Sequence, residues 1–360
     1  MAGLAVDGKP PTVDSPGRPR WLWWAVPAGL VIVLAVAAVV HFTRSGNDPG
    51  ADVVDNRPLV TTKTGVFSGA ELERVKAFQE WLGRDVDYAV DFPSRADWQQ
   101  ISQPQASIDN WKGSGYRPIY SIGMLPENPE DTMERGATGE YDHYYRELAR
   151  RLVAGDQANA IIRLGWEFNL EGSRWATGNS QAFIDYFRHV VAAMREEPGQ
   201  KFEFDWNPNN GSGKYDAVHY YPGADVVDYI GIDAYDVSWA NHSYPYPSDC
   251  DSKCRSERQT NAWNRSIYGG NRGLKFWSSF ARSKGKPLSL PEWGMWERID
   301  GHGGGDDPEY LRRMKAFIAD PKNRVAYQSY FEFDGEDGPH RLMTTYPEAG
   351  KVFRSLFGAG

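Results

Sequence analysis

Two glutamates in this 360-residue chain have the placement that acid-base chemistry requires. Glu167 ends an apolar run that begins at residue 160, and Glu292 lies near the end of a second run that begins at residue 287. Hydrolysis of a glycosidic bond needs two carboxyls, because one must donate a proton to the leaving oxygen while the other is ionised. A lone glutamate would be expected to form a salt bridge, for instance Glu167 with Arg163, but a pair at two strand ends favours catalysis.

The runs that carry these glutamates belong to a longer alternation of β-rich and helical segments. Predicted strands cover residues 64–67, 86–92, 117–124, 160–167, 202–206, 229–235, 287–293 and 326–333. Predicted helices cover residues 70–82, 141–154, 181–195, 273–283, 307–319 and 347–357. A polar stretch that ends at Asn110 follows the second strand, and a long loop holds both cysteines. Eight strand-helix units over about 300 residues indicate an α/β protein with a single (β/α)₈ TIM barrel. Alternation along the fourth strand would point Arg163 and Glu167 into this barrel and Ile162 and Leu164 outward.

Chemistry in such a barrel gathers where the strands end, and those ends are rich in polar and aromatic residues. They carry Asp91, Trp166, Asn169, Trp206, Asn207, Asn209, Asp233, Tyr235, Asp236, Trp293 and Trp296. Indole rings stack well on sugars, so Trp206, Trp293 and Trp296 are predicted to bind substrate, with ordinary packing as the alternative for each. Trp166 is predicted to bind substrate as well. The polar side chains are expected to hydrogen-bond sugar hydroxyls, except Asp233, which is expected to brace a loop.

Three further glutamates compete for the catalytic roles. Glu171 and Glu297 lie past their strand ends in loops, where an exposed carboxylate is the ordinary expectation. Glu332 is the stronger rival, because the eighth strand also delivers residues to the barrel rim.

Several blocks of sequence carry a family resemblance. They read RLGWEFN at 163–169, WNPN at 206–209, YPG at 221–223, GIDAYD at 231–236, KP at 286–287 and EWG at 292–294. In this order they resemble glycoside hydrolase family 26, a family of clan A retaining enzymes that contains β-mannanases and related endo-β-glycanases. The resemblance covers roughly residues 64 to 335, and several blocks in register are more specific than one motif.

The resemblance implies a role for individual residues. Glu167 would be the acid/base and Glu292 the nucleophile, with Tyr235 hydrogen-bonded to that nucleophile. Arg163 would lie beneath the acid/base, and Trp175 falls where the family has aromatic sugar platforms. The implied mechanism is double displacement with retention, for which the two carboxyl groups should lie ~5–5.5 Å apart.

The chain departs from the family at two positions beside the acid/base. Trp166 stands where family mannanases have His, and Leu170 stands where they have Gly. Because that His contacts the sugar next to the bond that is cleaved, the identity of the sugar stays open.

The N-terminal segment has the properties of a membrane anchor. Residues 21–40 carry no charge, and about 20 residues in helical rise span the roughly 30 Å of a bilayer core. Interfacial Trp21 and the preceding Arg18 and Arg20 predict a cytoplasmic N-terminus. A cleaved signal peptide is the alternative, since residues 35–37 read AVA. The predicted organisation is a cytoplasmic tail (1–20), a transmembrane signal-anchor (21–42), a linker (43–60) and a catalytic domain (61–360).

This arrangement predicts a single-pass protein of the cell membrane with an extracytoplasmic catalytic domain, secreted if the segment is cleaved. In that compartment Cys250 and Cys254 are expected to form a local disulfide, and a zinc half-site is the alternative. The seven histidines show no metal-ligand spacing, so no metal or cofactor is expected.

Composition narrows the class of partner. Lys and Arg number 40 and Asp and Glu 48, a net charge of −8, which argues against nucleic acid as a partner. Aromatic residues make up 14% of the chain, enough for both a core and a sugar-binding cleft.

The sequence therefore predicts a membrane-anchored retaining β-glycanase acting on a polysaccharide. The alternatives are a non-catalytic glycan-binding surface protein and a transglycosidase acting on the cell's own envelope polymer or exopolysaccharide.

Overall fold

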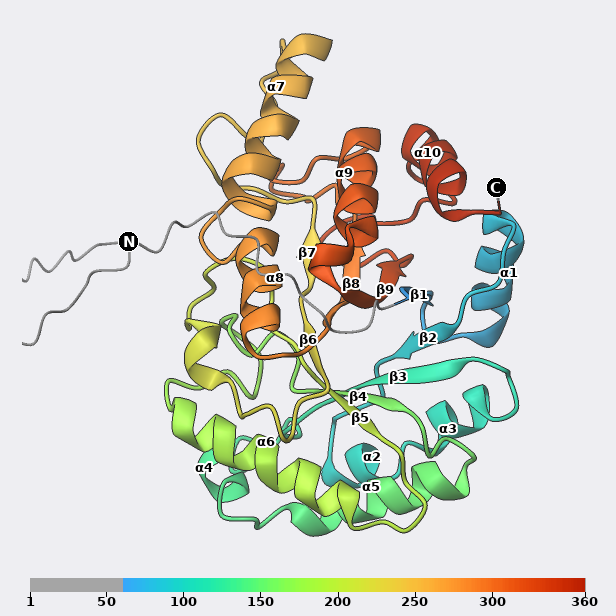
Figure 1. Cartoon of the computed structure of the whole chain (residues 1–360), viewed down its shortest axis with the longest axis vertical. Coiled ribbons are helices and arrows are strands. Elements are labelled where there is room, and N and C mark those ends of the chain that lie inside the picture. The colour runs from blue at the N-terminus through green and yellow to red at the C-terminus, as the bar shows by residue number, and fades with distance from the viewer. Residues whose placement is uncertain (1–60, 360) are drawn as a thin grey trace, which may run out of the picture. The chain divides into compact units, whose positions relative to one another are not determined.

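The computed structural model describes residues 61–359, which form a closed parallel β-barrel surrounded by helices (Figure 1). Its strands are β1 (Lys63–Phe67), β2 (Tyr88–Asp91), β3 (Arg117–Ile122), β4 (Ile161–Leu164), β5 (Glu203–Trp206), β6 (Tyr229–Gly231), β7 (Ala234–Tyr235), β8 (Leu288–Gly294) and β9 (Val325–Phe331). Neighbours pair in chain order, β6 and β7 both pair with β8, and β9 pairs with β1 to close the barrel. Because β6 and β7 share one position, the barrel has the eight positions that the sequence predicts.

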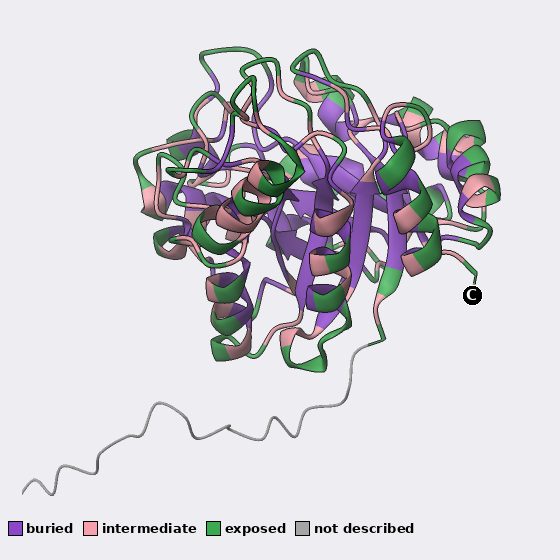
Figure 2. Cartoon of the chain, turned by 90° about the horizontal axis from the view of Figure 1, so that it is seen from above, coloured by how far each residue is buried: buried purple, intermediate pink, exposed green. Residues whose placement is uncertain are grey.

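Helices cover the outside of the barrel. The longer ones are α1 (Leu72–Leu82), α5 (Asp142–Ala154), α6 (Ser180–Arg195), α7 (Ser252–Ala262), α8 (Leu274–Ser283), α9 (Pro308–Ala319) and α10 (Pro347–Phe357). Local sequence sets their ends: the Asn179 side chain accepts a hydrogen bond from the backbone N–H of Ala182 at the start of α6, and α1 ends at Gly83 in a left-handed conformation. Figure 2 shows buried strands behind helices whose outer faces are exposed.

The secondary structure differs from the prediction in the polar stretch before Asn110, in the cysteine-containing loop, part of which forms α7, and at the end of the fourth strand. The polar stretch before Asn110 contains the short helices α2 (Trp98–Ser102) and α3 (Gln105–Trp111), where Ile101, Ile108 and Trp111 are buried. Strand β4 ends at Leu164 instead of continuing to residue 167, because Gly165 (φ 58°) takes the backbone into a left-handed turn. The alternation of side chains therefore does not extend beyond β4.

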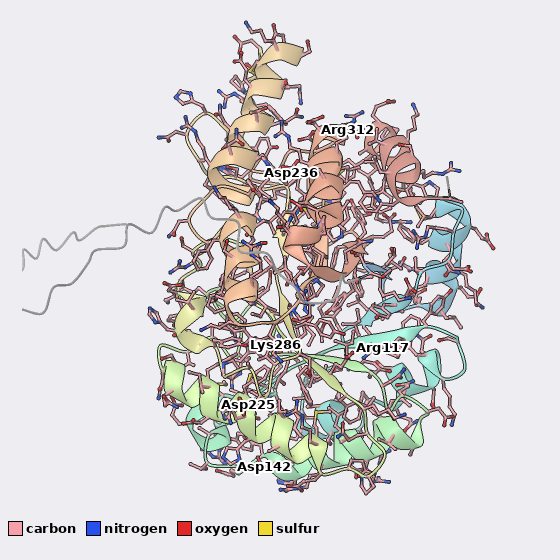
Figure 3. The ribbon with its side chains drawn as sticks, viewed as in Figure 1. Arg117, Asp142, Asp225, Asp236, Lys286 and Arg312 are labelled. Atoms are coloured by element: carbon pink, nitrogen blue, oxygen red, sulfur yellow. A yellow bond between two sulfur atoms is a disulfide. The ribbon has the colours of Figure 1, made fainter. Side chains whose placement is uncertain are left out.

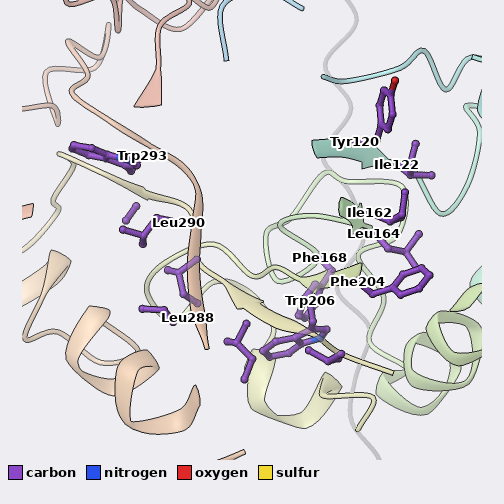
Figure 4. Packing of buried hydrophobic residues seen from close by; sticks show 14 of the residues in the cluster. Tyr120, Ile122, Ile162, Leu164, Phe168, Phe204, Trp206, Leu288, Leu290 and Trp293 are labelled. Carbon is purple, nitrogen blue, oxygen red and sulfur yellow. The ribbon is translucent and has the colours of Figure 1, made fainter. Parts of the chain in front are cut away.

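Along β4 itself the predicted alternation is confirmed. Ile162 and Leu164 lie in the large hydrophobic layer between barrel and helices, part of which Figure 4 shows beside Phe204. Ile161 packs in a second cluster with side chains from β1, β2, β3 and β9, inside the barrel, and Arg163 points the same way as Ile161. The barrel interior thus combines this cluster with buried polar groups, among them Arg163 and Asp205, which accepts a hydrogen bond from the Tyr327 hydroxyl.

Cys250 lies just before α7, and Cys254 lies in the first turn of that helix. A disulfide joins Cys250 to Cys254, and Asp251 caps the helix by accepting a hydrogen bond from the backbone N–H of Cys254. Since both sulfurs are bonded to each other, neither is available to a zinc ion.

The predicted tail, anchor and linker, residues 1–60, lie outside the described residues. Within residues 61–359, no helix combines the length and apolar character needed to cross a membrane.

Helix α10 provides a test of how the outer layer is held. Phe353 is buried against Phe78 and Trp81 of α1, at centroid distances of 6.2 and 6.1 Å, and against Trp293 of β8 at 6.0 Å. We expect Phe353→Ala to lower the free energy of unfolding by about 3–5 kcal/mol, because it leaves a cavity among these rings. Urea unfolding followed by circular dichroism measures the change.

The control is Lys351→Ala on the exposed face of the same helix, which should change the free energy of unfolding by no more than about 0.5 kcal/mol. Equal losses in the two variants would show that α10 is not held by this aromatic contact.

Candidate active site

A cavity of about 850 Å³ lies at the C-terminal ends of the barrel strands. Glu167, Tyr235 and Glu292 line it, together with residues from the loops that follow β5, β7, β8 and β9. The structure therefore brings together the two glutamates that the sequence selects. A cavity of this size accommodates several sugar units.

Glu292 is the more firmly held of the two carboxylates. It lies on β8 and is 7% exposed. One carboxylate oxygen accepts a hydrogen bond from the Tyr235 hydroxyl at 2.8 Å, and the other forms an ion pair with Arg163. Both oxygens are therefore oriented by partners that the sequence predicts to lie at the site.

Arg163 lies beneath the cavity and is fully buried. Besides Glu292 it forms an ion pair with Asp233, and it donates to Asn207 and to the Ser121 hydroxyl, the last at 3.0 Å. Although burial alone would lower it, Asp233 and Glu292 raise the pKa of Arg163, so the guanidinium stays charged. A salt bridge between Arg163 and Glu167 was the alternative to a catalytic role for Glu167. Arg163 instead forms its ion pairs with Glu292 and Asp233.

Glu167 comes from the turn that follows β4 and has a left-handed backbone with φ 52°. Its backbone N–H donates to the carbonyl of Asn207 at 2.8 Å, and its carboxyl group accepts a hydrogen bond from the Asn209 side chain. Burial and the negative charge of Glu292 raise the pKa of Glu167 to about 7. A carboxyl with this pKa can carry a proton near neutral pH, as a general acid must.

Asn169 holds the partner of Glu167 in place. Its side-chain oxygen accepts the Asn209 backbone N–H at 2.8 Å, and its amide nitrogen donates to the Asn209 carbonyl at 3.0 Å. Asn169 is fully buried, so it positions Asn209 and does not meet the predicted role in binding sugar.

Three predicted sugar-stacking residues are buried in the protein. Trp175, Trp206 and Trp293 are at most 1% exposed, and none borders the cavity. Their indole nitrogens donate to the carbonyl of Trp166, the carbonyl of Tyr220 and the side chain of Gln328, respectively. The prediction of sugar stacking is wrong for these residues, because long-range packing places them in the walls around the site.

Trp166 directly precedes Glu167 and packs beside the turn that carries it. Its ring packs against Phe92 at 5.4 Å and Trp175 at 4.6 Å, and it lies outside the cavity lining. Its side chain is half-buried and contributes to the apolar surroundings of the turn that carries Glu167, and its role in binding substrate stays a prediction.

Asp91, Asn207 and Asp236, three of the predicted hydroxyl-binding residues, are also buried, whereas Asn209 is half-buried and lines the cavity. Asp91 accepts a hydrogen bond from the Trp111 indole at 2.7 Å, and Asp236, labelled in Figure 3, accepts one from the Tyr244 hydroxyl at 2.8 Å. Asn207 accepts from Arg163, as described above. Asp233, which was expected to brace a loop, forms an ion pair with Arg163. Asp91, Asn207 and Asp236 are at most 2% exposed and do not border the cavity, whereas Asp233 does border it.

Trp296 is the predicted stacking residue that does line the cavity. It packs against Tyr235 at 5.3 Å and His340 at 4.8 Å. Sequence reasoning missed His340 itself, whose Nδ1 lies 2.8 Å from the Met295 carbonyl and whose pKa is lowered by burial. It also missed Trp239, which is 59% exposed and lines the cavity.

Two arginines at the cavity, Arg265 and Arg298, were missed as well. Trp239, Arg298 and His340 lie in loops beyond the strand ends, and Arg265 lies in a short π-helix that follows α7. Neither periodicity nor a motif marks a residue in these segments. An arginine or tryptophan in a long loop of a barrel is the one signal that could have indicated them.

The rival glutamates have other functions in the structure. Glu332 is 2% exposed, and its oxygens accept the backbone N–H groups of Leu342 and Met343 at 2.8 and 3.0 Å, which holds the loop after β9. Burial raises the pKa of Glu332 to about 7, but Glu332 does not border the cavity. Glu171 and Glu297 are exposed, and Glu171 pairs with Lys214.

Comparison with known proteins adds independent evidence on the fold. No family model matches the chain. Endoglucanase H of Acetivibrio thermocellus is 24% identical over 319 residues, which cover 83% of this chain and 30% of that protein. The chain therefore spans less than a third of the length of this relative.

Solved structures of glycoside hydrolases have a similar fold. A protein of a Muricauda species described as GH26C aligns with a TM-score of 0.54 and 14% identity, covering 83% of this chain and 85% of its own. The modular endo-β-1,4-mannanase of Cellulomonas fimi aligns with a TM-score of 0.53 and 17% identity, covering 82% and 70%. By fold, the chain groups with these glycoside hydrolases.

Proposed function

We propose that this chain is a retaining glycoside hydrolase that cleaves β-glycosidic bonds in a polysaccharide, with Glu167 as acid/base and Glu292 as nucleophile. One observation carries the proposal: two glutamates from different strands line a single cavity, and their surroundings differ. Glu167 has a pKa of about 7, while Glu292 is held by an arginine and a tyrosine. The names of the relatives, an endoglucanase and an endo-β-1,4-mannanase, support the same class of reaction.

The first step forms a covalent glycosyl-enzyme. A carboxylate oxygen of Glu292 donates an electron pair to the anomeric carbon, and the bond to the leaving oxygen breaks. Glu167 transfers its proton to that oxygen as it departs. The carboxylate produced on Glu167 then accepts a proton from water, whose oxygen attacks the anomeric carbon and releases Glu292.

The electrostatic coupling of the pair suits both steps. The charge of Glu292 helps to keep Glu167 protonated before the reaction. When Glu292 becomes an ester, its charge disappears and the pKa of Glu167 falls. Glu167 is then ionised and can act as the base in the second step. Arg163 stabilises the carboxylate that leaves in the second step.

We also propose that the domain works outside the cytoplasm, tethered by residues 21–42. The uncharged run in the sequence and the disulfide between Cys250 and Cys254, a bond typical of oxidising compartments, support this location.

Replacing either glutamate should abolish hydrolysis. We expect Glu167→Gln and Glu292→Gln to lower kcat/KM by at least about 1,000-fold on natural polysaccharide, because each removes a group that the reaction requires. Release of reducing ends from a panel of β-glycans measures the effect. Glu171→Gln, an exposed carboxylate outside the cavity, is the matched control.

If one glycan is cleaved equally well by all four proteins, the site assignment is wrong. Wild-type protein that binds glycan and never cleaves it would be a glycan-binding protein, and products longer than the substrate would identify a transglycosidase. Proton NMR of the first product should show a retained anomeric configuration, and an inverted product would contradict double displacement.

Activity should fall as pH rises through about 7. Glu167 must be protonated to act as acid, and its pKa is about 7, so kcat/KM should decline on the alkaline side. An aryl glycoside with a good leaving group needs no proton from Glu167 in the first step. Glu167→Gln should therefore form the glycosyl-enzyme from such a substrate, and the alkaline decline of kcat/KM should be absent. An alkaline limb that persists in Glu167→Gln would assign the titration to another group.

Tyr235→Phe should lower kcat about 10- to 100-fold with little change in KM, because it removes the hydroxyl that orients Glu292. Steady-state kinetics on the best panel substrate measures both constants. Tyr220→Phe is the control, since that hydroxyl donates to the Thr177 carbonyl and does not border the cavity. An unchanged kcat in Tyr235→Phe would exclude the positioning role.

A further inference from the structure

We propose that the cavity accepts a glycan that carries carboxylate groups, and that Arg265 binds one of these carboxylates. The inference rests on the proposed glycosidase function and names its substrate class, a polysaccharide containing uronic acid units. It comes from the charges that border the cavity and from the way Arg265 is mounted there.

Arg265 is an exposed residue in the cavity lining. Its side chain makes no hydrogen bond or ion pair with any residue in the range 61–359. An arginine that faces a cavity without a partner has all five N–H donors available to a ligand.

The other arginines at the site are already partnered. Arg298 forms two contacts of 3.0 Å with the carboxylate of Asp300, and its guanidinium packs over the Trp296 ring at 4.4 Å. Arg163, beneath the cavity, pairs with two buried carboxylates. Among the described residues that border the cavity, Arg265 is therefore the cation whose charge no acid offsets.

The acidic groups of the cavity do not take up this charge. Asp233 and Glu292 share Arg163, and Glu167 carries a proton below pH 7 and is held by Asn209. Asp337 belongs to the loop after β9 and forms no ion pair with Arg265. The free positive charge on the wall that includes Arg265 is thus available for an anion.

The backbone around Arg265 is fixed. Arg265 lies in a π-helix, Trp263–Ile267, in which the Tyr268 backbone N–H donates to the Trp263 carbonyl at 2.9 Å. The Asn210 side chain donates to the Ile267 carbonyl at 3.0 Å and ties this segment to the loop after β5.

A second tie joins it to the loop after β7, since the hydroxyls of Ser266 and Ser238 lie 2.7 Å apart. Single π-turns inside α-helices recur at functional sites, and a short segment held from two sides presents its side chain in a defined direction.

The chemistry of the guanidinium selects the ligand. Its planar fork matches a carboxylate with two parallel hydrogen bonds, and charge-assisted bonds of this kind are roughly twice as strong as neutral ones. A neutral sugar presents only hydroxyl groups and gains nothing from a net positive charge. A uronic acid unit uses both the fork and the charge.

Titration calorimetry of the full-length protein tests the proposal, with Glu167→Gln as the background so that ligands stay intact. The probes are two matched pairs of β-1,4-linked hexasaccharides: mannohexaose with hexamannuronate, and cellohexaose with its glucuronate counterpart. Members of each pair differ only in a CH₂OH or carboxylate at C6. We expect the uronate of at least one pair to bind about 10- to 100-fold more tightly at low salt, and less so at high salt.

Arg265→Gln should remove this preference, and Arg265→Lys should restore part of it, since lysine keeps the charge without the fork. Lys253→Gln removes an exposed positive charge on the nearby α7 outside the cavity lining and should leave the preference unchanged. Circular dichroism of each variant confirms that it is folded.

Equal or tighter binding of the neutral member in both pairs would overturn the proposal, as would a uronate preference that survives Arg265→Gln. Uronate binding that depends on Arg265, with no cleavage by wild-type protein, would uphold this inference and refute the hydrolase. Cleavage of a neutral hexasaccharide without uronate preference would uphold the hydrolase and refute this inference.

Discussion

The buried guanidinium of Arg163 is the contact on which the site depends. A fully buried cation is tolerated only when anions and hydrogen-bond acceptors surround it, and Asp233, Glu292 and Asn207 provide them. These partners come from the end of β5, from the segment between β6 and β7, and from β8. Arg163 therefore links three other parts of the barrel to β4 beneath the cavity. Removal of one partner would leave a charge uncompensated inside the barrel, at a cost of about 3–5 kcal/mol.

This distribution of partners also separates the two glutamates chemically. Glu292 receives the arginine and the Tyr235 hydroxyl, whereas Glu167 receives the neutral amide of Asn209. Two carboxyls in one cavity are thus made unlike by their neighbours, one stabilised as an anion and the other favoured as an acid. Burial of Glu167 and the neighbouring charge of Glu292 are the main causes of the raised pKa of Glu167.

The parts of this site that lie on strands could be predicted from the sequence. Period-two alternation places Arg163 inside the barrel, and the strand ends identify Glu167, Tyr235 and Glu292. Alternation could not foresee the turn at Gly165, which replaces the last residues of the predicted fourth strand. Propensity likewise missed α2 and α3, whose few buried residues depend on tertiary packing.

The tryptophans show why the remainder could not be predicted. A strand-end indole such as Trp206 is equally suited to a sugar and to a core, and only its neighbours, distant in sequence, decide. Residues of the long connections, such as Trp239 and Arg265, carry no periodic signal, so their presence at the cavity depends on how these connections fold over the barrel.

The left-handed backbone at Glu167 limits how this residue can be replaced. The path of the chain at Glu167 is fixed by the turn through Gly165 and by the hydrogen bond from the Glu167 backbone N–H to the Asn207 carbonyl. A β-branched residue such as valine disfavours that backbone region, so it would alter the path of the chain as well as remove the acid. An unbranched amide leaves the turn unchanged, which makes glutamine the substitution whose kinetics report on proton transfer alone.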